Sequence, residues 1–129
     1  MSQIADRLAA LGLTLPATHA AVGIVLPFEF AHRRGEVIFL SGHAPLNPDG
    51  SLAAPFGKVG AELSVAEGHA AARLTTLAML ASLNRVLGNL DRVKGWRRIF
   101  GMVNSAPGFT QQPAVMNGLI FSISGSRFS

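Results

Sequence analysis

The sequence contains no cysteine, and this absence excludes disulfide bonds, thiolate metal sites and a cysteine nucleophile. It also lacks long apolar runs, because none approaches the roughly 20 residues that a membrane-spanning helix needs. Residues 1–13 carry an acid and an arginine and have no uninterrupted apolar core, so they do not resemble a signal peptide. We therefore predict a cytoplasmic protein that does not span a membrane.

Groups that hold metals or nucleic acids are sparse. The four histidines, at 19, 32, 43 and 69, do not form a metal-ligand pattern such as two histidines four residues apart with a third ligand. The net charge is +4, but the basic side chains are spread along the chain and are dense only in residues 92–98. We predict no metal site and no nucleic-acid partner, and interpret the basic residues as a solvated surface.

The helix signals are local and clear. Residues 2–11 show apolar side chains at helical spacing. Ser64 and Glu67 form the capping-box pattern at the start of a helix, and the apolar stripe that follows predicts a helix over about 65–87. Gly88 is placed to end this helix in a left-handed conformation.

The remaining elements are predicted to be strands and turns of one sheet. A short, dense apolar run at 36–41 gives the clearest strand, and a turn is expected at 47–50. Further strands are predicted at 20–31, 91–104 and 118–124, with a turn at 32–35. The order of strands and helices predicts one α+β domain over residues 1–129, with a sheet and helices on one of its faces.

The segment after the clearest strand holds the best candidates for chemistry. Ser41 and Gly42 can present a hydroxyl and bare backbone amides to a ligand, or they can simply form the exit from the strand. His43 is a candidate general acid or base, but no carboxylate lies near it in the sequence. The glycine-rich residues 57–60 lack a full phosphate-loop pattern, so we interpret them as a loop. From these residues alone, no catalytic constellation is evident.

Six motifs, in this order and spacing, give the sequence a family resemblance. They are RRGEVIFLSGHAPL at 33–46, GKVGAELS at 57–64, EGHAAARL at 67–74, GNLDRV at 88–93, VNSAPGF at 103–109 and QPAVMNG at 112–118. Together they resemble the Rid family, also called YjgF or L-PSP endoribonuclease-like. Within it they resemble a longer RidA-like subgroup. The resemblance covers about residues 5–118.

The resemblance implies a fold, an assembly and a reaction. Members have a chorismate-mutase-like α+β fold, with a mixed sheet and helices packed on one face, and form homotrimers with clefts between subunits. The archetypal members hydrolyse enamines and imines of the 2-aminoacrylate type to 2-oxo acids and ammonia. No metal or organic cofactor is implied, and some members have been described as ribonucleases. The implied ligand is a small imine, enamine or carboxylate.

The resemblance also implies substrate-binding residues. Ser41 and Gly42 match the Ser-Gly at the floor of the family's cleft, and His43 follows where a glutamine is common. Phe28 stands where the deaminases have a cleft tyrosine, so the ring is kept and the hydroxyl is lost. Asn117 matches an asparagine at the start of the family's second helix.

The sequence departs from the family after about residue 118. The family's carboxylate-binding arginine, in an Ala-Arg-Ser-like segment, and a later glutamate have no counterpart in the divergent residues 119–129. We therefore expect an incomplete C-terminal part, as a frameshift or truncated reading frame would produce, and weak or no deaminase activity. The alternatives are a non-catalytic module that binds small molecules or partners, and a fragment without independent function.

Overall fold

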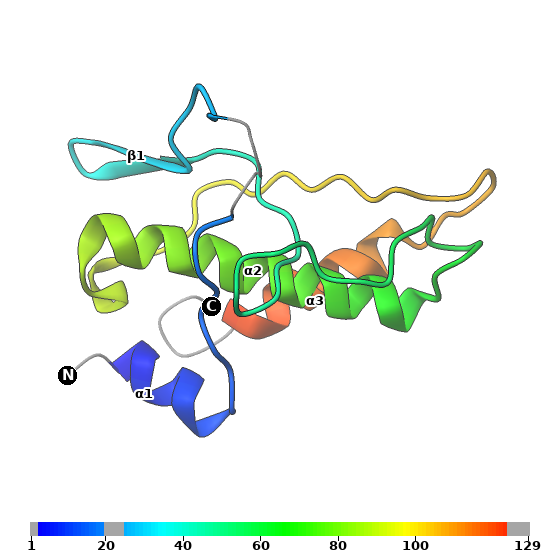
Figure 1. The fold of residues 1–129 in the computed structure, drawn as a ribbon, viewed down its shortest axis with the longest axis horizontal. Helices are drawn as coiled ribbons and strands as arrows, with labels where there is room; N and C mark the ends of the chain where they lie inside the picture. The colour runs from blue at the N-terminus through cyan, green and yellow to red at the C-terminus, as the bar shows by residue number, and fades with distance from the viewer. Residues whose placement is uncertain (1–2, 20–24, 124–129) are drawn as a thin grey trace.

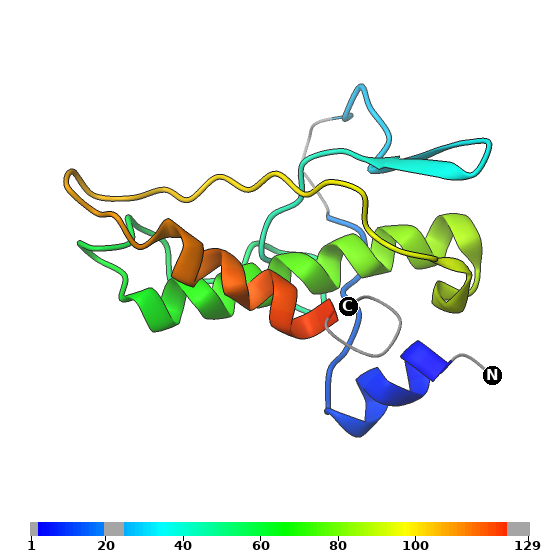
Figure 2. The ribbon, with the colours of Figure 1, turned by 180° about the vertical axis from the view of Figure 1, so that it is seen from behind.

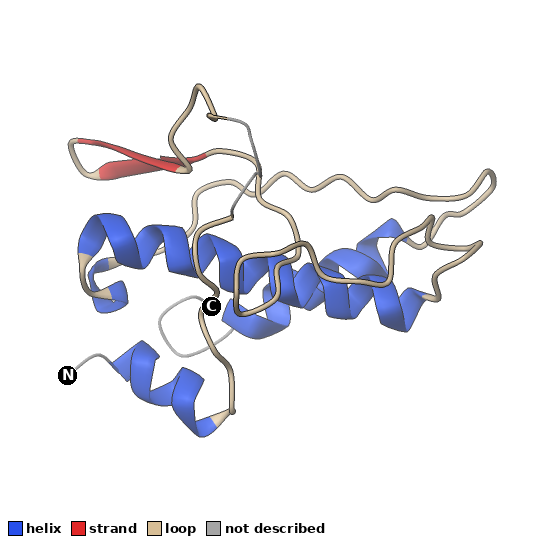
Figure 3. Ribbon diagram, viewed as in Figure 1, coloured by secondary structure: helices blue, strands red, loops and turns tan. Residues whose placement is uncertain are grey.

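The computed structural model describes residues 3–19 and 25–123 (Figure 1). Its elements, in chain order, are α1 (Gln3–Ala10), β1 (Ala31–Arg34), β2 (Val37–Leu40), α2 (Val65–Leu87), the 3₁₀ helix η1 (Leu90–Arg92) and α3 (Gln112–Ile123). The β1–β2 hairpin lies on one side of α2, α1 lies on the other, and α3 runs beside α2 (Figure 3). The predicted α+β class is confirmed.

The long helix α2 begins and ends where its sequence signals predict. The Ser64 side chain accepts a hydrogen bond from the Glu67 amide at 3.1 Å, and the Glu67 carboxylate accepts one from the Ser64 amide at 3.0 Å. Gly88 ends the helix with φ 74° and donates its amide to the Asn84 carbonyl. These contacts satisfy backbone groups that a helix end otherwise leaves unpaired.

The hairpin corrects the predicted turn at 32–35. His32 and Arg34 belong to strand β1, which pairs in antiparallel register with β2 from Ala31 opposite Leu40 to Arg34 opposite Val37. The turn is at Gly35 and the residue after it, where Gly35 has φ 61°. Pairing with an apolar strand thus outweighs the polar composition of β1, because strand propensity depends on the partner.

Two other predicted strands are wrong over most of the residues that the structure describes. In the segment predicted at 20–31, residues 20–24 lie outside the described residues and residues 25–30 are irregular. The segment predicted at 91–104 starts in η1 and then runs extended without a regular strand partner among the described residues (Figure 2). It contacts the loop before α2 only at its far end, where the Val59 amide donates to the Asn104 carbonyl at 2.8 Å. An extended chain becomes a strand only when a neighbour satisfies its backbone groups.

Helix α3 corrects the strand predicted at 118–124, whose last residue lies outside the described part. Val115, Gly118 and Leu119 are buried. A Cβ added at Gly118 would collide with the backbone carbonyl of His69, so glycine is what lets α3 approach α2 this closely. Packing against α2 therefore outweighs the β-branched composition that favoured a strand.

Apolar side chains form two clusters along α2. The larger cluster joins α1, α2 and η1 through Leu8, Leu77, Leu80, Leu83 and Leu90, and Ile38 and Leu40 of the hairpin pack against it. The smaller cluster joins the loop before α2 to α3 through Val59, Leu63 and Val115. Among the described residues, no helix has both the length and the apolar character needed to cross a membrane.

Candidate functional site

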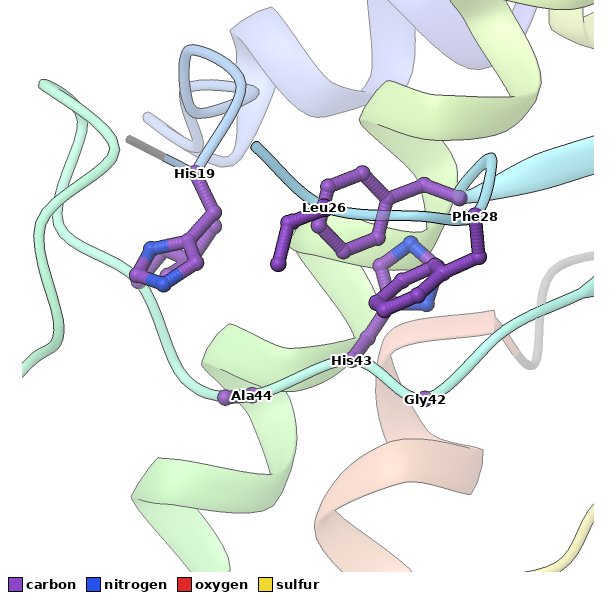
Figure 4. A pocket seen from close by; sticks show the side chains of 8 residues that line it. His19, Leu26, Phe28, Gly42, His43 and Ala44 are labelled. Atoms are coloured by element: carbon purple, nitrogen blue, oxygen red, sulfur yellow. The ribbon is translucent and has the colours of Figure 1, made fainter. Parts of the chain in front are cut away.

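A partly open pocket of about 260 Å³ lies between the segment before β1 and the segment after β2 (Figure 4). The side chains of Phe28 and His43 point toward each other in this pocket, and His19 lies on its other side. It is lined by His19, Leu26, Phe28, Phe30, Gly42, His43, Ala44 and Leu46. The lining is thus mainly apolar, with two histidines as its titratable groups.

Ser41 holds the two segments together. Its amide donates to the Phe30 carbonyl at 2.9 Å, and its hydroxyl donates to the Glu29 carbonyl at 2.6 Å. The segment that carries Phe28 is thereby fixed against the chain that carries Gly42. Ser41 itself does not line the pocket, so the structure gives its hydroxyl a supporting contact.

Aromatic rings form one wall of the pocket. The Phe28 and Phe30 rings meet edge to face, with centroids 5.5 Å apart and planes at 81°. The Phe30 ring lies 5.3 Å from the His43 ring at a tilt of 54°. Such offset contacts are favourable for aromatic pairs. At Gly42 an added Cβ would meet nothing within 4 Å, so the bare backbone there faces open space.

Both ring nitrogens of His43 are engaged. Nδ1 lies 2.7 Å from the Ser41 carbonyl, and Nε2 lies 2.7 Å from the Ser82 hydroxyl on α2. Because a carbonyl only accepts, Nδ1 must carry the proton and donate. Arg85 donates from Nη2 to Ser82 Oγ at 3.0 Å. The consistent arrangement is that Arg85 donates to Ser82, Ser82 donates to Nε2 of neutral His43, and His43 donates to Ser41.

The surroundings of His43 favour its neutral form. Burial lowers the pKa of His43 below its ordinary value of 6.5, the hydrogen bond to the Ser41 carbonyl opposes this shift, and the positive charge of Arg85 adds to it. Neutral His43, with both nitrogens bonded, has no free lone pair to take a proton from water. It therefore shapes the pocket and does not offer a ready general base.

A second, more open groove of about 340 Å³ adjoins the pocket and shares Phe28 and Phe30 with it. Its remaining lining includes Ser82, Arg85 and Val86 from α2, together with Glu29 and Ala31. The groove places a guanidinium and a carboxylate beside the aromatic wall. The pocket lining itself has no such charged side chains, but the adjoining groove supplies them.

The structure brings together three of the five residues predicted to bind substrate. Phe28, Gly42 and His43 line the pocket, and Ser41 lies behind it. Asn117 lies apart, because Gly118 beside it packs on His69 and Ala72 of α2. Ser82, which contacts His43, is ten residues farther along α2 than Ala72, or about 15 Å at 1.5 Å per residue.

Sequence reasoning missed Ser82 and Arg85. Ser82 is 2% exposed and interrupts the leucine stripe of α2, and Arg85 follows one turn later on the same face. A buried serine within an apolar stripe is the signal that identifies this position. Among the described residues, no three His, Asp or Glu side chains cluster closely enough to hold a metal ion.

Comparison with known proteins identifies relatives over almost the whole chain. Residues 5–125 match the profile of a family described as "YjgF/chorismate mutase-like, putative endoribonuclease". Protein TCP17 of Trypanosoma cruzi is 37% identical over 128 residues, which are 97% of this chain and 77% of that protein. The match continues past residue 118, where we expected the resemblance to end, and includes helix α3.

Solved structures agree with this assignment. A crystal structure described as a "putative endoribonuclease" from Shewanella oneidensis has a TM-score of 0.83 and 34% identity, and the similarity covers 98% of this chain and 83% of that one. A protein of unknown function from Agrobacterium tumefaciens has a TM-score of 0.75 and 27% identity, with 96% and 74% covered. The chain belongs to the YjgF/chorismate mutase-like family.

Proposed function

We propose that this chain binds a small carboxylated imine or enamine in the pocket beside His43. The observation that carries this proposal is the convergence of Phe28, Gly42 and His43 on one mainly apolar pocket. Its volume of about 260 Å³ suits a ligand of a few heavy atoms, somewhat below the range typical of drug-sized ligands. Gly42 leaves room for the ligand to approach the backbone.

The reaction implied by the family resemblance makes modest demands on such a pocket. A 2-aminoacrylate tautomerises to the imine, and water adds to the C=N carbon to give a carbinolamine. That intermediate expels ammonia and leaves the 2-oxo acid. The imine carbon is already electrophilic, so holding it next to a water molecule supplies much of the acceleration. We propose that turnover is slow here, because His43 has no free nitrogen to activate that water.

The test uses 2-aminoacrylate generated in situ, with pyruvate formation as the readout. We expect wild-type protein to accelerate pyruvate release weakly and Gly42→Val to abolish the acceleration by filling the pocket. Gly95→Val is the matched control, because an added Cβ there also meets nothing within 4 Å and Gly95 does not line the pocket. Equal rates of pyruvate release for wild type and Gly42→Val would show that the pocket takes no part in the reaction.

A second candidate is a binding module without catalysis. It is favoured by the lining of the pocket, which includes no lysine, arginine, aspartate or glutamate side chain. This candidate predicts that a stable 2-oxo acid raises the melting temperature while pyruvate release stays at the uncatalysed rate. Acceleration that Gly42→Val abolishes would exclude it.

We also propose that the chain assembles into a homotrimer. Large apolar side chains are exposed on the hairpin and on the extended segment, with Phe39 60%, Phe100 76% and Met102 87% exposed. Association would cover such side chains. Size-exclusion chromatography with light scattering is expected to give a sharp trimer, and a monomer at every concentration would contradict the proposal.

A further inference from the structure

Arg85 is a cation without an acidic partner in the described part of the chain. The acid–base contact found there is between Glu29 and His32 at 3.3 Å, and no described carboxylate lies within 4.0 Å of Arg85. Its contact is the 3.0 Å hydrogen bond from Nη2 to Ser82 Oγ. A guanidinium has five N–H donors in a planar fork, so several remain for a ligand.

The position of Arg85 connects this cation to the pocket. Ser82 lies between Arg85 and His43, with hydrogen bonds of 3.0 Å and 2.7 Å on its two sides. Arg85 lines the groove, His43 lines the pocket, and the Phe28 and Phe30 rings border both. A ligand a few atoms long can therefore lie against the two rings with its apolar end beside His43 and an anionic end in the groove.

Glu29 acts against this arrangement. It lines the same groove, and its side chain is 76% exposed. Its carboxylate repels an anion bound by Arg85, and its Oε2 atom lies 3.3 Å from Nδ1 of His32. Arg85 favours an anion in the groove, and Glu29 disfavours one. Substituting each residue in turn should therefore change anion binding in opposite directions.

We propose that Arg85 is the carboxylate-binding residue of this chain and selects small 2-oxo or 2-imino acids. The inference rests on the proposed function and deepens it, because it supplies the anion-binding group that the pocket lining does not contain. A carboxylate takes two parallel hydrogen bonds from the guanidinium, which is the geometry that arginine favours. The Ser82 contact holds the guanidinium beside the aromatic wall.

The test is a titration of folded full-length protein with 2-oxobutanoate, followed by NMR, with its uncharged methyl ester as second ligand. Arg85→Gln is expected to weaken 2-oxobutanoate binding roughly tenfold or more, since one charge-assisted hydrogen bond accounts for that much. It should leave ester binding unchanged. Arg73→Gln is the matched control, because Arg73 is an exposed arginine of α2 that lines neither the pocket nor the groove.

Glu29→Gln provides an independent measurement that leaves Arg85 in place, in case Arg85→Gln fails to fold. It should tighten 2-oxobutanoate binding by roughly two- to threefold, as expected for one exposed charge. If Arg85→Gln and Arg73→Gln bind 2-oxobutanoate equally, or Glu29→Gln changes nothing, the inference is overturned and the pocket stays a binding site. If folded wild type binds neither ligand, the proposed function fails as well.

Discussion

The two sides of α2 are built differently. On the side of α3, the chain is closely packed. Val59, Leu63 and Val115 form a buried cluster, and Gly118 allows the backbones of α2 and α3 to come into direct contact. On the side of the hairpin, the regular sheet described has two strands, and the extended segment after η1 carries Phe100 and Met102 largely exposed. The first side holds a buried apolar cluster, whereas the second exposes large apolar side chains that association could cover.

The difference shows which interactions position the pocket. The pocket lies on the hairpin side, yet its histidine is hydrogen-bonded to Ser82 of α2, which is itself buried. Helix α2 therefore serves as a rigid base, and the loops around Phe28 and Gly42 are attached to it by a few hydrogen bonds. Loops on a rigid scaffold are a common way to build a binding site.

The largest expected effect contrasts the truncation of a buried apolar side chain with that of an exposed one. Leu80 is 2% exposed, so Leu80→Ala should lower the free energy of unfolding by about 2–5 kcal/mol. Met102 is 87% exposed in the single chain, so Met102→Ala should change it by less than about 0.5 kcal/mol at concentrations too low for the proposed trimer to form. Urea denaturation of both variants checks this pair. Similar losses for both would show that Met102 is covered in solution.

A second prediction concerns the contact between α2 and α3. Gly118→Ala places a methyl group against the His69 carbonyl, so the helices must separate. We expect a loss of about 1–3 kcal/mol in the free energy of unfolding. Gly95→Ala is the control, because an added Cβ there meets nothing within 4 Å. A Gly118→Ala variant as stable as this control would mean that α3 does not pack on α2 as described.

The smallest effect concerns the pH dependence of stability. Burial lowers the pKa of His43 in the folded state below its ordinary value of 6.5. The unfolded chain therefore takes up a proton at this position before the folded chain does, and the stability contributed by neutral His43 is lost as the pH falls below about 6.5. His43→Gln removes this titration. Wild type should thus lose more stability than His43→Gln between about pH 7.5 and pH 5.5, as measured by thermal melts. Parallel pH profiles would contradict the assignment of neutral His43.

The sequence predicted the elements whose signals are local. The capping box at Ser64 and the left-handed Gly88 identify α2 to the residue, because both act within a few positions of the helix ends. Other elements depend on contacts with residues far away in the sequence. This holds for the strands predicted at 20–31 and 91–104 and for residues 118–123, which form a helix and not a strand. Propensity alone therefore placed them wrongly. Gly118 is the clearest case, since its role is set by the His69 carbonyl on another helix.

The candidate site could likewise be predicted only where its residues carry a local sequence motif. Phe28, Gly42 and His43 follow from motifs matched to the family, and the structure brings them to one pocket. Ser82 and Arg85 have no motif of their own, and their proximity to His43 arises from the packing of α2 under the hairpin. Asn117 lies in the middle of α3 and not at a helix start as the family match implied, and it does not line the pocket.

The most direct test of the proposed binding site is an NMR titration of wild-type protein with 2-oxobutanoate that resolves individual N–H signals. If the pocket beside His43 binds the ligand, chemical-shift changes should concentrate on Phe28, Phe30, Gly42 and His43, extend to the Nε–H signal of Arg85 and spare Asn117. Changes centred on Asn117 and α3, or no changes in a folded protein, would contradict the claim that the pocket beside His43 is the binding site of this chain.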